Sequence, residues 1–258
     1  MAAATGMNKP AKPAARRDPV ATRARLLQVA IGEFAAKGYS GARIDAVAAR
    51  AKVNIRMIYH YFGGKEALYI AVLEDTLAKL RADELKLDFS AMPPLDGIMQ
   101  LFDFIDGHFT GHPELMKLLS SENLNKARFM QKSAAIPVMA TPVLRLLQTL
   151  LQRGVADGCI ATGIEPLHLY VTLVSLAYFH KSNAHTLSRI FATDLLAPAW
   201  QAEHKAQTRR MLLQFLAPTA PGDSRDAASA ALPLTPAHAA VAVPAADAAT
   251  VAALELSA

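Results

Sequence analysis

The sequence predicts an all-α protein, and two observations carry this prediction. Apolar residues recur at intervals of three and four along most of the chain, which is the spacing of one helix face. No segment shows the sustained alternation of apolar and polar residues that marks a half-buried strand. Because 52% of the 258 residues are apolar, the chain can bury a core, and its length suits one large domain or two small ones.

The first helix is expected to begin at Asp18-Pro19, because aspartate is a favoured N-cap and proline suits the first helical position. It is expected to end at Gly38, since glycine readily leaves the helical conformation. Two short helices should follow, around residues 44–48 and over 55–62.

A longer helix is expected from Lys65 to about Leu85, after the break at Gly63-Gly64. The apolar spacing then predicts five more helices, at 95–109, 114–126, 143–155, 167–180 and 199–216. The fold should therefore contain roughly nine or ten helices.

Charge and composition divide the chain further. Residues 1–70 carry 12 Lys and Arg against 4 Asp and Glu, a net charge of +8, whereas the remainder carries −3. This imbalance favours a polyanion-binding module on a neutral body, although a solvated basic tail on an ordinary helical protein explains it equally well. From its start to its end, the chain is expected to contain a disordered basic arm at 1–17, a helical module at 18–64, a helical body at 65–217 and a disordered Ala/Pro-rich tail at 218–258. A transient helix around Val251 is the alternative for the tail.

The segments of the helical module have the lengths and joints of a helix-turn-helix. In that motif a turn of three or four residues places the second of two short helices in the DNA major groove. The turn here is 51–54, with Val53 directed inward and Asn54 capping the second helix. A small core is expected from apolar residues of three helices: Phe34, Ile44, Val47, Ala48, Ile58 and Tyr59.

The residues that open the second helix are candidates for reading DNA bases. They are Asn54, Ile55, Arg56 and Met57. Arg56 can donate two hydrogen bonds to guanine O6 and N7, and Ile55 or Met57 can touch a thymine methyl group. The alternative for Arg56 is a contact to phosphate only.

Four further residues are candidates for phosphate contacts. The hydroxyl groups of Tyr59 and Tyr61 can reach phosphates from the far end of the helix, and a core position is the alternative for Tyr59. Lys65 and Arg43 each open a helix, where their charge adds to the positive helix terminus. His60 is expected on a solvated face.

Residues 20–80 resemble the DNA-binding domain of TetR-type transcriptional regulators. The resemblance is carried by the segments at 44–48, 51–54 and 58–68, of which the run IYHYFGGKEALY is the most specific. It implies an all-helical homodimer with a variable C-terminal ligand domain, acting as a repressor of nearby genes. Two departures from the family pattern stand out: Lys52 where glycine is usual, and Ala42-Arg43 where threonine or serine is usual. The first costs roughly 1 kcal/mol in a left-handed turn, and the second removes a capping hydroxyl and one expected phosphate contact.

The resemblance also implies a ligand pocket and a dimer interface in the helical body. The pocket candidates are aromatic residues with one polar neighbour: Phe102, Phe109, Asn123, Phe129, Tyr170 and Tyr178. An ordinary core is the alternative for each of them. The implied homodimer would use Leu167–His180 and Trp200–Leu216, where Leu169, Leu173, Leu176 and His180 form a stripe that one subunit is expected to leave partly uncovered. An ordinary intramolecular core is the alternative for these helices.

No enzyme, metal or membrane feature emerges from the sequence. His108 and His112 have a metal-ligand spacing, but Gly107, Gly111 and Pro113 argue against a continuous helix there, and a third ligand is lacking. Cys159 is the only cysteine, so no internal disulfide forms, and we expect neither a catalytic thiol nor a cofactor. With no apolar stretch near 20 residues and no secretory signal, the expected compartment is the cytoplasm.

The sequence thus favours a dimeric, sequence-specific regulator of transcription that binds double-stranded operator DNA and is released by a small organic ligand. A ligand-independent DNA-binding protein controlled by a protein partner is the first alternative. An α-helical enzyme with an incidental basic end is a distant second.

Overall fold

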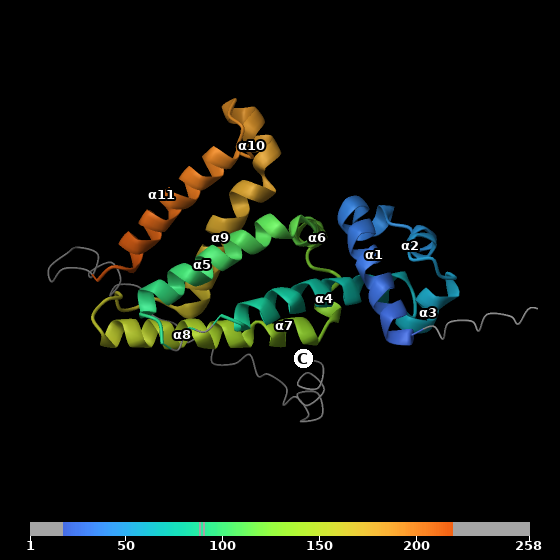
Figure 1. Ribbon diagram of the computed structural model, residues 1–258, viewed down its shortest axis with the longest axis horizontal. Helices are drawn as coiled ribbons and strands as arrows, with labels where there is room; N and C mark the ends of the chain where they lie inside the picture. The colour runs from blue at the N-terminus through green and yellow to red at the C-terminus, as the bar shows by residue number, and fades with distance from the viewer. Residues whose placement is uncertain (1–17, 88, 90, 219–258) are drawn as a thin grey trace, which may run out of the picture. The chain divides into compact units, whose positions relative to one another are not determined.

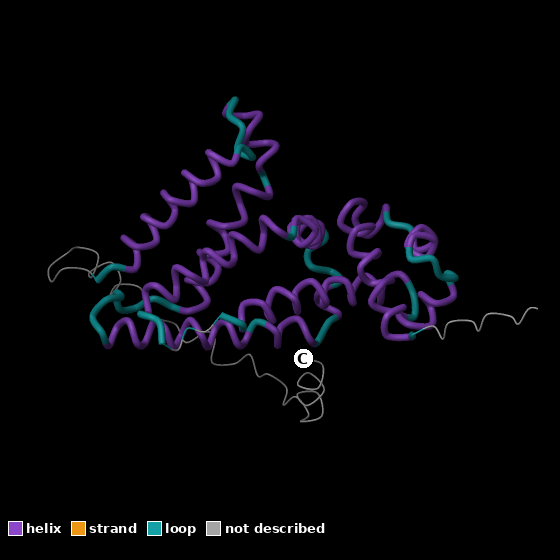
Figure 2. Tube along the Cα trace, viewed as in Figure 1, coloured by secondary structure: helices purple, strands orange, loops and turns teal. Residues whose placement is uncertain are grey.

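The computed structural model describes residues 18–87, 89 and 91–218, which form two compact units, one ending at Val72 and one beginning at Leu73 (Figure 1). Within these ranges the chain contains helices and loops and no strand (Figure 2). The all-α prediction is therefore confirmed. The expected basic arm at 1–17 and the expected tail, apart from Pro218, lie outside the described residues.

The first unit contains α1 (Pro19–Gly41), α2 (Ile44–Arg50), α3 (Arg56–Phe62) and the beginning of α4 (Lys65–Leu85). Helix α1 starts as the sequence predicts, because the Asp18 carboxylate accepts hydrogen bonds from the backbone N–H groups of Val20 and Ala21. Gly38 leaves the helical conformation with φ 64°, and one short further turn carries the segment to Gly41.

The core of the first unit joins all four helices. Its fully or nearly fully buried members include Leu26, Phe34, Val47, Ile58, Leu68 and Tyr69. The rings of Phe34 and Tyr69 pack with centroids 4.8 Å apart, and Tyr39 lies 5.3 Å from Tyr69. Tyr59 is 54% exposed, so the expectation that it belongs to this core is wrong.

The second unit contains the remainder of α4 and eight further elements. These are α5 (Pro94–Gly111), α6 (Pro113–Leu124), η1 (Met130–Lys132), α7 (Ala135–Met139), α8 (Thr141–Ala156), α9 (Pro166–Ser182), α10 (Ala184–Phe191) and α11 (Pro198–Leu216). The short helices α7 and α10 were not expected. In Figure 1, α10 lies at the turn between α9 and α11.

Two helix ends differ from the sequence-based expectation. Helix α6 stops at Leu124 because Lys126 and Ala127 both take a left-handed backbone conformation, with φ of 57° and 55°. Helix α5 continues through Gly107 to Gly111, whereas the glycines were expected to interrupt it. An internal glycine costs a helix only about 1 kcal/mol, which the burial of Phe102, Ile105 and Phe109 on the same helix outweighs.

Helix α5 is the centre of the second unit, since it packs against α6, α8, α9 and α11. Gly97 allows the close approach of α8, because a Cβ atom at this position would lie 3.0 Å from the Leu150 Cδ2 atom. The apolar core around these helices includes Ile98, Leu101, Leu147, Leu173 and Leu212. No helix among the described residues is both long and apolar enough to cross a membrane.

Candidate nucleic-acid interface

The turn between α2 and α3 has the geometry of a helix stop followed by a new helix. The Val53 N–H donates to the Ala48 carbonyl and the Lys52 N–H to the Ala49 carbonyl, both at 3.0 Å, which is the Schellman pattern. This pattern needs a left-handed residue, and Lys52 supplies it with φ 56°. Lys52 stands where the family that the sequence resembles has glycine, and it adopts the left-handed backbone conformation that glycine favours. Val53 is half-buried, as an inward-directed residue should be.

Helix α3 presents its first turn to solvent. The Asn54 side-chain oxygen accepts a hydrogen bond from the Arg56 N–H at 2.9 Å, so Asn54 caps the helix as the sequence predicts. Ile55 and Arg56 are exposed and Met57 is half-buried, whereas Ile58 and Phe62 on the other face are buried. The candidate base-reading residues thus lie on the free face of a helix that is anchored by its opposite face.

The candidate phosphate-binding residues of α3 lie toward its end. Tyr59 is exposed, and Tyr61 is half-buried with its ring against His60 and Phe62. His60 is exposed, as expected. The left-handed Gly63 ends the helix, and the Arg23 guanidinium covers the Phe62 ring at 5.1 Å from its centroid.

Lys65 is held by neighbours from the end of α1. Its Nζ atom donates to the Ser40 carbonyl at 3.4 Å and lies 4.9 Å from the centroid of the Tyr39 ring. The ammonium group is therefore fixed beside the segment that leads into α2. A fixed, half-exposed cation at a helix start is a suitable partner for a phosphate.

Arg43 has a partner that competes with phosphate. Its guanidinium donates to both carboxylate oxygens of Asp45, at 3.1 and 2.7 Å, and the hydrogen bonds from Arg43 hold the pKa of Asp45 below its ordinary value. Both side chains are exposed, so this ion pair contributes little stability. For Arg43 to contact a phosphate as expected, its guanidinium group has to separate from the Asp45 carboxylate.

A buried carboxylate that the sequence analysis missed lies behind α2. Glu33 of α1 is 2% exposed and accepts hydrogen bonds from Lys37 Nζ at 2.9 Å and from the Arg43 N–H at 3.2 Å, and it pairs with Arg50. Burial raises the pKa of Glu33, but these hydrogen bonds and positive charges outweigh burial and lower it below its ordinary value. The only signal in the sequence was an acidic residue on the apolar face of α1.

The second unit does not bring the candidate ligand residues into one site. Phe102, Phe109 and Phe129 are buried, whereas Asn123 is exposed on the last turn of α6. The hydroxyl of Tyr178 lies 2.8 Å from Ser120 Oγ, and its ring meets Phe109 edge to face.

Tyr170 belongs to a buried polar cluster that the sequence analysis missed. Its hydroxyl accepts from Arg81 Nη1 at 2.6 Å and donates to Glu84 Oε1 at 3.2 Å, and Arg81 also pairs with Glu84. Burial raises the pKa of Glu84 and raises the pKa of Tyr170 to about 12. Arg81 and Glu84 are three residues apart on α4, a spacing that is also common in ion pairs on helix surfaces. The sequence alone therefore did not show that this pair is buried.

His108 of α5 and His112, which directly follows this helix, form a stacked pair. The rings of His108 and His112 lie 4.1 Å apart at 18°, and burial lowers the pKa of His108 to about 4. Among the residues that the structure describes, no three His, Cys, Asp or Glu side chains come together as metal ligands.

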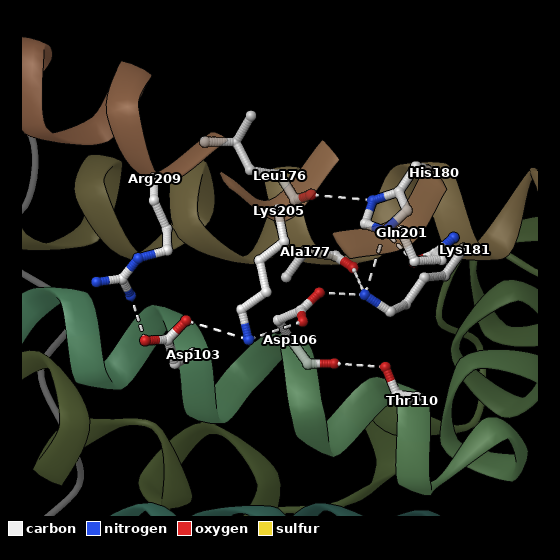
Figure 3. Close-up of polar contacts among 10 residues, drawn as sticks. All are labelled: Asp103, Asp106, Thr110, Leu176, Ala177, His180, Lys181, Gln201, Lys205 and Arg209. Atoms are coloured by element: carbon white, nitrogen blue, oxygen red, sulfur yellow. Dashed lines mark hydrogen bonds and ion pairs between the residues drawn. The ribbon is translucent and has the colours of Figure 1, made fainter. Parts of the chain in front are cut away.

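Helices α9 and α11 are fixed to α5 by a network of ion pairs (Figure 3). Asp106 pairs with Lys181 of α9 and with Lys205 of α11 at 3.3 Å, while Asp103 pairs with Lys205 at 3.1 Å and with Arg209. The ring of His180 lies beside this network, with Nε2 3.1 Å from Gln201 Oε1. These contacts determine which faces of α9 and α11 remain outside.

The outward face of α9 is not the one expected. Leu169, Leu173 and His180 of the expected interface stripe are buried within the subunit, so that expectation is wrong for these residues. Helix α9 carries apolar residues on nearly all of its sides, and the face opposite to these buried residues is exposed. The exposed apolar residues of the two helices are Leu167, Val171, Phe179, Met211, Leu213 and Phe215.

Comparison with known proteins agrees with this architecture. Residues 26–72 match the family described as bacterial regulatory proteins, tetR family, and residues 94–212 match the tetracyclin repressor-like C-terminal domain. The transcriptional repressor NicS of Pseudomonas putida is 36% identical over 174 residues, which cover 67% of this chain and 82% of NicS. The repressor SCO4008 of Streptomyces coelicolor is 40% identical over 110 residues, covering 43% of this chain and 54% of the relative.

Solved structures show the same fold at lower identity. The putative transcriptional regulator SCO4942 from Streptomyces coelicolor superposes with a TM-score of 0.58 at 22% identity, over 76% of this chain and 98% of that one. The reduced form of Escherichia coli NemR gives a TM-score of 0.56 at 23% identity, over 78% and 99% of the two chains. Together with the helix-turn-helix geometry of α2 and α3, these matches establish that the chain belongs to the TetR family of DNA-binding transcriptional regulators.

Proposed function

We propose that this chain is a dimeric repressor whose α3 reads an operator and whose second unit binds a small organic effector that releases the DNA. The observation that carries the proposal is the orientation of α3. Its Ile58 and Phe62 face is buried in the first unit, while Ile55, Arg56 and Tyr59 are exposed. A helix held in this way can enter a major groove without losing its packing.

Base reading is assigned to the first turn of α3. Arg56 is exposed, and its backbone is fixed by Asn54, so its guanidinium can form a bidentate contact with guanine. Ile55 and Met57 supply apolar contacts to thymine methyl groups. Phosphate contacts are assigned to Tyr59, Tyr61, Lys65 and, after release from Asp45, Arg43.

The assignment of bases and phosphates is tested with two substitutions. The probes are a duplex that the wild-type chain enriches from a randomised pool and a scrambled duplex, compared at one salt concentration. We expect Arg56→Ala to weaken the enriched duplex by about 1–3 kcal/mol more than the scrambled one. Lys65→Ala should weaken both by similar factors, because phosphates carry no sequence information.

Two outcomes would contradict this assignment in different ways. An equal loss on both probes for Arg56→Ala makes Arg56 a phosphate contact and moves base reading to Asn54, Ile55 or Met57. No effect of either substitution on any duplex excludes α3 as the recognition helix.

Binding of the wild-type chain to DNA should also depend on salt. The log of the binding constant should fall with the log of salt concentration at roughly −0.9 per phosphate contacted.

The dimer is assigned to α9 and α11. Leu167, Val171 and Phe179 are spaced by four and eight residues and thus lie on one i, i+4 row, which winds slowly around α9. Met211 and Phe215 are spaced in the same way on α11. Exposed apolar residues on two such helices are typical of a surface that another subunit covers, and the homodimer that the TetR family implies supports a second copy as that subunit.

Effector binding is assigned to the interior of the second unit, which the proposed domain 65–217 contains. The candidate contacts are the aromatic residues Phe102, Phe109 and Tyr178 and the polar cluster at Tyr170, because effector sites are mostly apolar with a few polar groups. Since these residues do not form one site in this structure, an effector would have to rearrange the packing around them. An effector releases DNA only if it binds better to the conformation that does not fit the operator. Helix α4 is proposed to link effector binding to DNA release, because Lys65–Val72 belong to the first unit and the rest of the helix belongs to the second.

A further inference from the structure

Helix α2 begins at a residue whose side chain does not cap it. Its N-cap residue is Arg43, whose side chain makes no capping hydrogen bond and is instead paired with Asp45. The third helical position, where a glutamate would normally reach back to the N-cap N–H, is Ala46. The local sequence therefore lacks both halves of a capping box.

Glu33 of α1 supplies the missing acceptor from outside the helix. Its Oε1 atom accepts the Arg43 N–H at 3.2 Å, which is the bond that a capping-box glutamate would make. Its Oε2 atom pairs with Arg50, the last residue of α2. One buried carboxylate thus holds both ends of α2 against α1.

The position of α3 depends on α2. Helix α2 has seven residues, and isolated helices of that length are not stable in water. It packs against both α1 and α3. Loss of its hold on α1 would therefore let the first half of the helix-turn-helix fray and would misplace the recognition helix.

We infer that Glu33 is a positioning residue for DNA reading, which acts through α2 and never touches DNA itself. The inference rests on the proposed role of α3. It runs against the simple electrostatic expectation, because an acidic side chain in a DNA-binding unit repels phosphates and its removal should tighten binding. The two views predict opposite changes in affinity.

The test compares Glu33→Met with Glu33→Gln on the enriched and the scrambled duplex. Methionine removes the acceptor and the charge but keeps the length of the side chain. Glutamine removes the charge and keeps an oxygen for the Arg43 N–H. We expect Glu33→Met to weaken the enriched duplex about fivefold, the size of a lost helix cap, and Glu33→Gln to weaken it less. Affinity for the scrambled duplex should stay equal or rise.

A rescue variant separates positioning from a general loss of stability. Ala46→Glu places a capping-box acid inside α2 and, combined with Glu33→Met, restores the wild-type net charge. We expect the pair to recover most of the affinity for the enriched duplex, with Ala46→Glu alone as reference. Glu114→Met, the same change at an exposed position of α6, is the matched control and should alter neither affinity.

Hydrogen exchange of the α2 amides gives a readout that does not depend on DNA. The Val47 N–H, bonded to the Arg43 carbonyl at 3.1 Å, should exchange faster in Glu33→Met and recover with Ala46→Glu. If Glu33→Met does not fold, Glu33→Gln and its exchange rates carry the test. Unchanged or tighter binding of the enriched duplex, or no rescue by Ala46→Glu, overturns the inference. A wild-type chain that enriches no duplex overturns the proposed function instead.

Discussion

Single residues of this chain adopt backbone conformations that their side chains disfavour. Lys52, Lys126, Ala127 and Ala192 all have positive φ, where glycine alone is free of a steric penalty. At Lys52 the reason is clear, because the two hydrogen bonds that end α2 require a left-handed residue between the helices. The lysine is thus strained by the motif that positions α3.

Replacement of Lys52 by glycine should therefore stabilise the first unit. We expect Lys52→Gly to raise the free energy of unfolding by about 1 kcal/mol, measured by urea denaturation. Lys79→Gly is the matched control, since Lys79 lies within α4 and its glycine variant should lose about the same amount. A Lys52→Gly protein that is no more stable than wild type would contradict the strain argument.

Buried histidines give the fold a pH dependence of definite sign. Burial lowers the pKa of His108 and of His180 to about 4, from an ordinary value of 6.5. Between these values the unfolded chain binds protons that the folded chain does not, so stability falls as the pH drops from 6.5 toward 4. The loss is at most about 1.36 kcal/mol per pH unit for each histidine.

The contribution of one histidine can be isolated by substitution. Between pH 4 and 6.5, the slope of unfolding free energy against pH should be shallower for His180→Gln than for wild type. The difference should be at most that of one bound proton, about 1.36 kcal/mol per pH unit. Glu84, whose pKa burial raises, acts in the opposite direction in both proteins and cancels in the comparison. Equal slopes for the two proteins would show that His180 titrates normally in the fold.

At the scale of helices, apolar spacing predicted most elements, and it predicted the buried face of some helices but not of others. On α1 and α5 the apolar residues form one stripe, so the buried face of each could be predicted from the sequence. Helix α9 is apolar on nearly all sides, and spacing could not tell its core face from its outer face. The ion pair that fixes α9 to α5 joins Asp106 and Lys181, which are 75 positions apart, and only the assembled fold identifies it.

The buried pair between α5 and α9 should behave differently from a surface pair. Asp106→Leu leaves Lys181 buried without its closest partner, and we expect a loss of about 3–5 kcal/mol in unfolding free energy. Asp106→Leu with Lys181→Met should recover most of the loss, because an apolar pair of similar size replaces the ions. Denaturant unfolding measures both. Asp83→Leu, which breaks the exposed pair with Lys86, should cost less than about 1 kcal/mol.

At the scale of the whole molecule, the sequence predicted the local geometry of the first unit more completely than that of the second. The turn at Lys52 and the cap at Asn54 are local features, so their geometry follows from neighbouring residues. The support from Glu33 and the cluster of Arg81, Glu84 and Tyr170 depend on packing between helices distant in sequence. Asn123 was a pocket candidate because it lies near apolar residues in sequence, yet the backbone of α6 directs it outward and buries Glu122 instead.

The assembly of two chains is tested at the exposed face of α9. Phe179 is 59% exposed, so Phe179→Glu should leave the subunit folded while placing a charge in the proposed dimer surface. We expect the variant to sediment as a monomer at concentrations where wild type is a dimer. Because a dimer binds two half-sites about one helical turn apart, affinity for the enriched duplex should fall more than tenfold, to roughly that of one half-site.

The control for this substitution is Leu124→Glu, which charges an exposed leucine at the end of α6 that is not part of the proposed dimer surface. It should change neither sedimentation nor DNA affinity, because no partner subunit is proposed to cover it. A dimeric Phe179→Glu protein would move the interface away from this face of α9. A monomeric variant with full affinity would separate DNA reading from dimerisation, and each α3 would then have to recognise its site alone.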